Sequence, residues 1–193
     1  MRILLDMPEP VWHNGYMNKL DSKKREQVIS AIIEGCSIRS VVRMTGIAKK
    51  TVTRLLLEVG AVCSEYQNRA FRNLTCRRLQ VDELWGFIGA KERNLTPKNM
   101  ARGAVGDIWL WTAIDAETKI VPSWFLGDRG PESAYTFMTD LAGRLRNRVQ
   151  LTSDGLKVYL NAVEDAFGAN IDYAMLVKIY GEASDGQKRY SPA

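Results

Sequence analysis

Two aspartates stand where a carboxylate is unusual unless it has a partner. Asp82 lies in residues 78–91, where apolar and aromatic residues dominate as they do in a strand packed on a core. A buried ionised carboxylate costs on the order of several kcal/mol unless a cation compensates it. Asp154 follows a short predicted strand, residues 149–153. Taken singly, Asp82 is explained by an ion pair with Arg or Lys, and Asp154 by a turn.

The remaining metal-binding side chains are few. The chain has one histidine, His13, and three widely spaced cysteines, Cys36, Cys63 and Cys76. This set excludes a zinc site and argues against a disulfide framework, so we expect reduced thiols in a cytoplasmic protein. No apolar run approaches the ~18 residues of a membrane span, and the first residues lack a signal-peptide pattern.

The composition is that of a globular protein with a basic balance. The 193 residues suffice for one medium domain and one small domain. Their net charge of +5 favours a polyanionic partner such as nucleic acid.

The first third of the sequence predicts three short helices. Either Asp21 or Ser22 can cap the first helix, and Gly35 can end it, while Ser37 can cap the second. Gly46 makes a turn before a third helix at residues 49–60, whose apolar residues recur with helical spacing. This arrangement is typical of a helix-turn-helix, which binds double-stranded DNA.

In that geometry the first turn of the third helix enters the major groove. The side chains that we expect to contact DNA are Lys49, Lys50, Thr51, Thr53 and Arg54. Residues 19–60 hold nine Lys or Arg against four Asp or Glu. The alternative is a small helical bundle whose basic residues form a solvated face.

The rest of the chain alternates between strand-like and helix-like stretches. The predicted order is β-β-β-α-β-α-β, with strands at residues 78–91, 108–114, 120–126, 149–153 and 171–180. The first three strands should form an antiparallel meander, and Pro122 confines the third strand to an edge. The second strand is a nearly continuous apolar run, as in a strand buried on both faces.

The fold class is therefore α/β, a helix-turn-helix followed by a mixed sheet. The domain bounds that we predict are 1–18 for a flexible lead-in, 19–63 for the helix-turn-helix, 64–76 for a linker, 77–181 for the α/β core and 182–193 for a tail. The strand order resembles the ribonuclease H-like fold, in which the first and fourth strands are neighbours. That fold would place Asp82 beside Asp154.

The four tryptophans of the predicted strands should lie in the core rather than stack on bases. They are Trp85, Trp109, Trp111 and Trp124. Between the first two strands, a basic segment either lines a path for DNA or is a solvated loop. Its cations are Lys91, Arg93, Lys98 and Arg102.

Two short motifs carry a resemblance to a known family. Residues 82–91 (DELWGFIGAK) resemble the first catalytic motif of insertion-sequence DDE transposases, and residues 152–155 (TSDG) resemble the second. The resemblance spans roughly residues 79–180. It implies that Asp82 and Asp154 bind Mg²⁺ or Mn²⁺, and that the protein cleaves DNA at the ends of a mobile element and joins them to target DNA. A homo-oligomer is among the open possibilities.

The family also needs a third acid, on a helix after the fifth strand. Residues 182–193 show no helical pattern, so we expect a core truncated before this ligand. Three alternatives stay open. The chain is a DNA-binding transposase remnant with an impaired site, or Glu182 or Asp185 completes the site, or the protein is a helix-turn-helix regulator with a non-catalytic α/β domain. Glu164 and Asp165 should face solvent.

Overall fold

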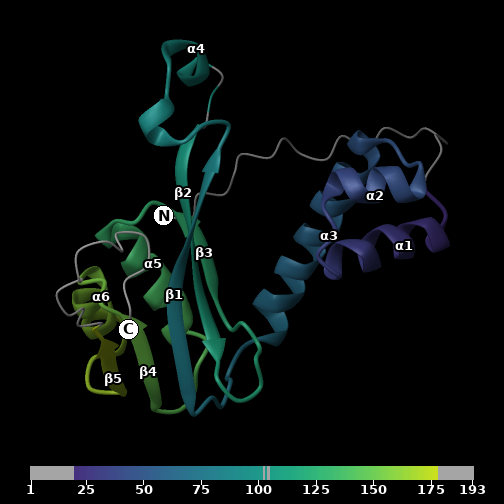
Figure 1. The fold of residues 1–193 in the computed structure, drawn as a ribbon. Helices are drawn as coiled ribbons and strands as arrows, with labels where there is room; N and C mark the ends of the chain where they lie inside the picture. The colour runs from purple at the N-terminus through teal and green to yellow at the C-terminus, as the bar shows by residue number, and fades with distance from the viewer. Residues whose placement is uncertain (1–19, 102, 104, 178–193) are drawn as a thin grey trace, which may run out of the picture. The chain divides into compact units, whose positions relative to one another are not determined.

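The computed structural model of this chain describes residues 20–101, 103 and 105–177. These residues form six α-helices, one 3₁₀ helix and five strands (Figure 1). The chain divides into two compact units between Ala70 and Phe71. Within the described ranges, no helix is both long and apolar enough to cross a membrane.

The first unit consists of three helices whose ends follow local sequence signals. The helices are α1 (Ser22–Ile33), α2 (Ile38–Thr45) and α3 (Lys49–Ala70). The Asp21 carboxylate caps α1 by accepting from the Lys24 N–H at 2.8 Å, and the Ser37 hydroxyl caps α2. Gly46 ends α2 in the left-handed conformation, with φ of 69°, which glycine adopts without strain.

The prediction that the third helix ends at Gly60 is wrong. The helix α3 continues through residues 61–70, so the first part of the segment predicted as a linker is helical. A glycine inside a helix costs only about 1 kcal/mol relative to alanine, which the good helix formers that follow can offset.

A small core holds the three helices together. Val28, Val41 and Val52 are fully buried, and Ile47 and Leu55 are nearly so. Arg25 on α1 also pairs with Glu58 on α3 at 3.6 Å, although both side chains are exposed and the pair contributes little. The core therefore fixes the start of α3 against the turn that precedes it.

The second unit is built on one mixed five-stranded sheet. Its strands are β1 (Arg78–Ile88), β2 (Gly106–Asp115), β3 (Trp124–Gly127), β4 (Val149–Asp154) and β5 (Ile171–Leu176). The order across the sheet is β3-β2-β1-β4-β5. The first three strands are antiparallel neighbours with β3 at the edge, which confirms the predicted meander, and β1, β4 and β5 run parallel.

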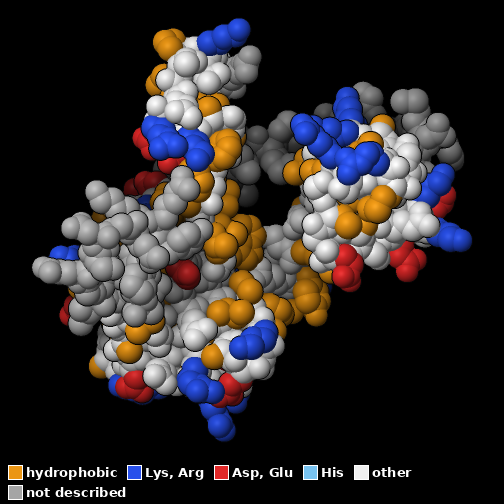
Figure 2. All heavy atoms as spheres, viewed as in Figure 1, with side chains coloured by type: hydrophobic (Ala, Val, Ile, Leu, Met, Phe, Trp, Pro, Cys, Tyr) orange, Lys and Arg blue, Asp and Glu red, His pale blue; other side chains and the backbone are white. Residues whose placement is uncertain are grey.

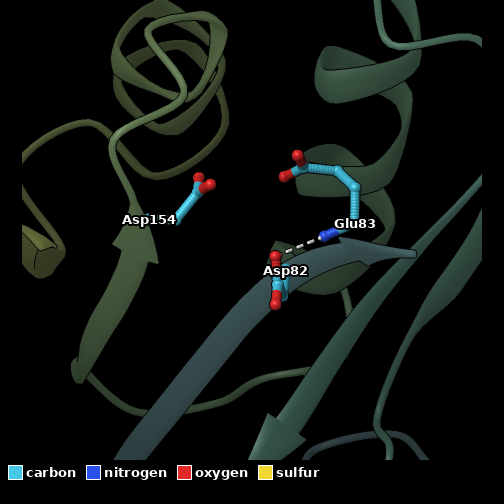
Figure 3. A group of neighbouring side chains, drawn as sticks. All are labelled: Asp82, Glu83 and Asp154. Carbon is cyan, nitrogen blue, oxygen red and sulfur yellow. Dashed lines mark hydrogen bonds between the residues drawn. The ribbon is translucent and has the colours of Figure 1, made fainter. Parts of the chain in front are cut away.

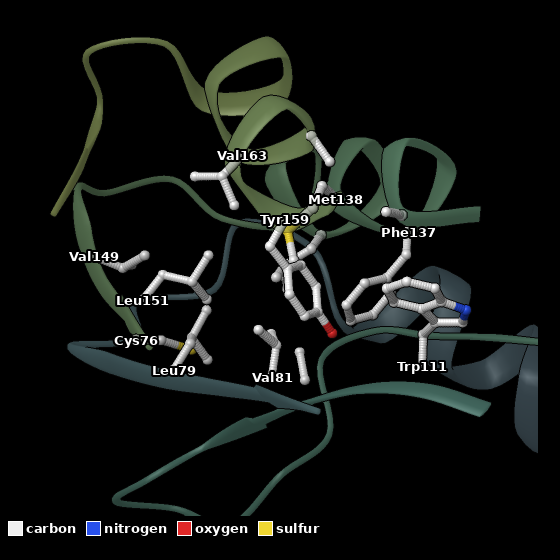
Figure 4. Packing of buried hydrophobic residues seen from close by; sticks show 14 residues of the cluster. Cys76, Leu79, Val81, Trp111, Phe137, Met138, Val149, Leu151, Tyr159 and Val163 are labelled. Carbon is white, nitrogen blue, oxygen red and sulfur yellow. The ribbon is translucent and has the colours of Figure 1, made fainter. Parts of the chain in front are cut away.

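Two helices cover one face of this sheet, α5 (Pro131–Ala142) and α6 (Val158–Phe167). Leu79 and Val81 of β1, Trp111 of β2 and Leu151 of β4 are buried beneath these helices (Figure 4). Tyr159 of α6 lies edge-on to the Trp111 ring, 5.5 Å between centroids. The second core thus joins β1 and β4 through the same two helices.

The predicted burial of the strands is only partly correct. Strand β2 is not buried on both faces, because α5 and α6 pack on one face and the other face is partly exposed. Trp111 is buried and Trp109 packs against the core, as expected. Trp124 and Trp85, in contrast, are 45% and 43% exposed. Trp124 lies on the face opposite to the helices, and Trp85 lies beyond the part of β1 that they cover.

Beyond the five-stranded region, β1 and β2 continue as a two-stranded ribbon. Residues 86–88 pair with residues 106–108, and no other strand of the described chain pairs with them. The predicted loop at its end contains η1 (Glu92–Asn94) and α4 (Pro97–Met100) (Figure 1). We call residues 84–110 the arm.

Candidate functional site

The parallel pairing of β1 and β4 brings three acids together. Val81 of β1 lies opposite Ser153 of β4. The residues that come next on these parallel strands, Asp82 and Asp154, are therefore also neighbours. Glu83 turns towards the same place (Figure 3). Each of the three residues offers one carboxylate oxygen, and these oxygens all lie within 4.8 Å of one another. We call Asp82, Glu83 and Asp154 the acid cluster.

The expectation that Asp82 is the buried acid of β1 is wrong. Asp82 is exposed, because it lies on the face of the sheet that α5 and α6 do not cover. Its carboxylate accepts from the backbone N–H of Glu83 at 2.9 Å. Asp154 is half-buried and accepts from the N–H of Leu156 at 3.0 Å. These backbone donors orient both aspartates, Asp82 within β1 and Asp154 at the end of β4.

Glu83 is the acid that β1 buries. Its side chain is 1% exposed, and its Oε2 accepts two hydrogen bonds from the Arg129 guanidinium, at 3.2 and 3.3 Å. Arg129 in turn lies over the Trp109 ring, 4.5 Å from its centroid. The second oxygen, Oε1, is buried without a hydrogen-bond partner in the described part of the chain.

Tyr159 lies next to this carboxylate. Burial is the main cause that raises the pKa of its phenol, and the neighbouring Glu83 carboxylate raises it further, as a hydrogen-bond acceptor and as a negative charge. The phenol is therefore protonated at neutral pH. Neither its oxygen nor Oε1 of Glu83 has another hydrogen-bond partner among the described residues. The phenol is thus the protein donor that faces this carboxylate.

The acid cluster fits a divalent cation. Hard carboxylate oxygens are the ligands that Mg²⁺ and Mn²⁺ prefer, and the three residues offer three such oxygens within 4.8 Å of one another. Arg129 balances one of the three negative charges. A cation of charge two would balance the others and offset their mutual repulsion.

The buried position of Glu83 predicts a pH-dependent cost. Burial is the main cause that raises the pKa of Glu83 above its ordinary 4.5, and Asp154 adds to it. Below pH 4.5 the Glu83 carboxyl is protonated in both folded and unfolded chains, so burying this neutral group lowers the free energy of unfolding only a little. As the pH rises through the folded pKa, the unfolded chain loses its proton first and the folded state loses stability.

In the metal-free protein, Glu83→Gln should therefore gain stability relative to wild type as the pH rises above about 4.5. Urea unfolding in EDTA at pH 4, 5.5 and 7 measures this difference. The matched control is Glu117→Gln, which changes a more exposed glutamate. A difference between Glu83→Gln and wild type that stays constant with pH would contradict the prediction.

The predicted DNA-contacting residues all lie in the first two turns of α3. Lys49, Lys50 and Arg54 are exposed. Thr51 and Thr53 are half-buried, and the Thr53 hydroxyl donates to the Lys49 carbonyl at 3.0 Å. Lys and Arg side chains gather on one part of the surface of this unit (Figure 2). The sequence thus presents a group of cations at the start of α3.

Within the described part of the chain, no other acid considered from the sequence joins the cluster. Glu164 and Asp165 are exposed on α6, as expected. Glu182 and Asp185 lie outside the described residues, as does Arg102 in the arm. Sequence reasoning missed Glu83, Arg129 and Tyr159. The signal for Glu83 was its place two residues after Val81, on the core-facing side of a strand with period 2.

Comparisons with known proteins give a distant likeness in structure. No family model matches the sequence, and no curated protein matches it. Among the solved structures that match is a piggyBac transposase synaptic complex with hairpin DNA, with 11% sequence identity and a TM-score of 0.41. The match covers 88% of this chain and 44% of that chain, so this protein spans less than half the length of that transposase chain.

Proposed function

We propose that this protein is a DNA transposase of the DDE type, which binds the ends of a mobile element and cleaves DNA with divalent metal. The observation that carries this proposal is the acid cluster, in which Asp82, Glu83 and Asp154 each offer one carboxylate oxygen within 4.8 Å of the other two. The two sequence motifs that resemble this family contain these three residues. We also propose that the mixed sheet is ribonuclease H-like.

The chemistry of phosphodiester cleavage suits this group. Divalent metal bound at the cluster would activate the attacking water or 3′-hydroxyl and offset the charge on the leaving oxygen. Asp82 and Asp154 are accessible from solvent and can hold metal where a DNA strand can approach. Glu83 is fixed by Arg129 and supplies a third carboxylate from within the sheet.

This third carboxylate changes the reading of the site. The sequence predicts an impaired enzyme, because a third acid on a helix after the fifth strand was not found. Glu83 offers a third ligand from the first strand instead, so the proposal is of a competent metal centre. Its role differs from that implied by the family resemblance, in which Asp82 and Asp154 alone match motif positions.

The first unit supplies the means to hold DNA. We propose that α2 and α3 form a helix-turn-helix, with Lys49, Lys50 and Arg54 at the DNA. The glycine turn at Gly46 and the exposed cations at the start of α3 support this role. The partners would be the terminal repeats of the element and its target DNA. The protein would then act in the cytoplasm, at the nucleoid.

Nicking of supercoiled plasmid tests the proposal. The full chain should convert supercoiled DNA to the open circle in Mn²⁺ or Mg²⁺, and excess EDTA should stop the reaction. Duplex DNA bound without nicking in either metal would contradict the proposed chemistry. That outcome would favour the alternative of a helix-turn-helix regulator with a non-catalytic α/β domain.

A further inference from the structure

Two aromatic rings and one lysine form an exposed surface on the arm. Trp85 and Phe87 are 43% and 49% exposed, and their ring centroids lie 5.8 Å apart. The Lys91 ammonium lies 4.8 Å from the Trp85 centroid and 6.0 Å from the Phe87 centroid. We call these three residues the aromatic strip. Hydrophobic and basic side chains reach the surface together along the arm (Figure 2).

The aromatic strip is continuous with the acid cluster. Residues 83, 85 and 87 share one face of β1, and successive side chains on that face are roughly 6–7 Å apart. Trp85 of β1 is paired with Trp109 of β2. The Arg129 guanidinium lies over the Trp109 ring. Arg129 donates to Glu83 of the acid cluster. A row of rings and cations therefore leads away from the proposed metal centre.

We propose that the aromatic strip binds unpaired bases of the DNA strand that the acid cluster cleaves. This inference rests on the proposed function, because the position of the strip beside that site identifies its ligand as DNA. Exposed rings can stack on bases of any sequence once those bases leave the duplex. Lys91 adds a positive charge where the phosphates of that strand would lie.

The charges of the arm favour a polyanion by a small margin. Its described residues carry three cations, Lys91, Arg93 and Lys98, against two acids, Glu92 and Asp107. The Asp107 carboxylate accepts from the Glu92 N–H at 2.9 Å, which holds it at the base of the arm. Removing this negative charge should strengthen binding of a polyanion. An apolar protein partner would not respond to the charge in this direction.

The experiment measures fluorescence anisotropy of labelled oligonucleotides with the full chain in EDTA, so that no cleavage occurs. The probes are a single strand of about 15 thymidines and a duplex of about 25 base pairs. Trp85→Ala should weaken single-strand binding about tenfold, the effect of losing one stacked base, and change duplex binding less than about twofold. Asp107→Asn should tighten single-strand binding.

Two further variants control for folding and for exposure. Trp85→Phe keeps a ring and should retain most of the single-strand affinity. Trp124→Ala removes a tryptophan that is 45% exposed on the opposite face of the sheet, and should leave that affinity unchanged. Equal effects of Trp85→Ala and Trp124→Ala on the single strand, or equal weakening of duplex and single strand by Trp85→Ala, would overturn the inference.

The test separates this inference from the proposed function. The assay contains no metal, so a chain that fails to cleave plasmid can still show the selective loss of single-strand binding. Conversely, the wild-type chain could cleave plasmid while Trp85→Ala and Trp85→Phe bind the single strand with wild-type affinity. The protein would then have the proposed activity without this binding surface.

Discussion

Asp154→Asn should lower the rate of metal-dependent DNA cleavage at least about 1000-fold, and Asp82→Asn should do the same. Each change keeps the shape of the side chain and removes one negative charge from the acid cluster. Metal-assisted cleavage depends on several kcal/mol of charge stabilisation, and each 1.36 kcal/mol is worth a factor of ten in rate. The loss should appear in the rate of plasmid nicking at saturating Mn²⁺.

The matched control is Asp165→Asn, which neutralises an exposed aspartate on α6. It should nick plasmid at the rate of wild type. All three variants should bind duplex DNA within about twofold of wild type, because the cluster and the cations of α3 belong to different units. Nicking by Asp154→Asn at the rate of wild type would show that the activity comes from another source.

Lys50→Ala combined with Arg54→Ala should weaken binding of duplex DNA about 10- to 100-fold. Both side chains are exposed in the first two turns of α3, where a helix-turn-helix contacts the major groove and the flanking phosphates. Two lost phosphate contacts should also reduce the slope of log affinity against log salt concentration by about two. Anisotropy at several salt concentrations measures both quantities.

Lys23→Ala is the control for this pair of changes, since it removes an exposed lysine from α1. Its salt slope should stay close to that of wild type. The double variant should retain its metal site, because the acid cluster lies in the other unit. If the double variant and Lys23→Ala weaken binding equally, the basic residues act as a diffuse charge and α3 is not the contacting helix.

The pairing of the two aspartates was expected from the resemblance of the element order to the ribonuclease H-like fold, in which the first and fourth strands are neighbours. In the structure β1 and β4 do pair in parallel, with Val81 opposite Ser153. The proximity of Asp82 and Asp154 follows from this register. The glycine turn at Gly46 and the caps of α1 and α2 were also readable, because they depend on a few adjacent residues.

The identity of the buried acid was not predictable in the same way. Period 2 places Glu83 on the face of Leu79 and Val81, but the pattern does not show which elements cover that face or how far along β1 they reach. The answer depends on α5 and α6, which cover the side of Leu79 and Val81 and so bury Glu83. Its partner Arg129 lies 46 residues further along the chain, a separation that no local pattern encodes.

The exposure of Trp85 has a similar cause. A tryptophan in a strand is usually buried, so the sequence favours the core for all four. The strand β1 continues past the helices that cover its first half, and there the same alternation places Trp85 and Phe87 on an open ribbon. The length of a strand relative to its covering helices is a tertiary property that composition does not show.

Titration of the full chain with Mn²⁺, followed by calorimetry without DNA, tests the central claim that the acid cluster is a metal centre. We expect saturable binding by wild type, and affinity at least about tenfold weaker in each of Asp82→Asn, Glu83→Gln and Asp154→Asn, since each removes a carboxylate ligand. Asp165→Asn should bind as wild type does. Equal Mn²⁺ affinity in wild type and all three cluster variants would contradict the account.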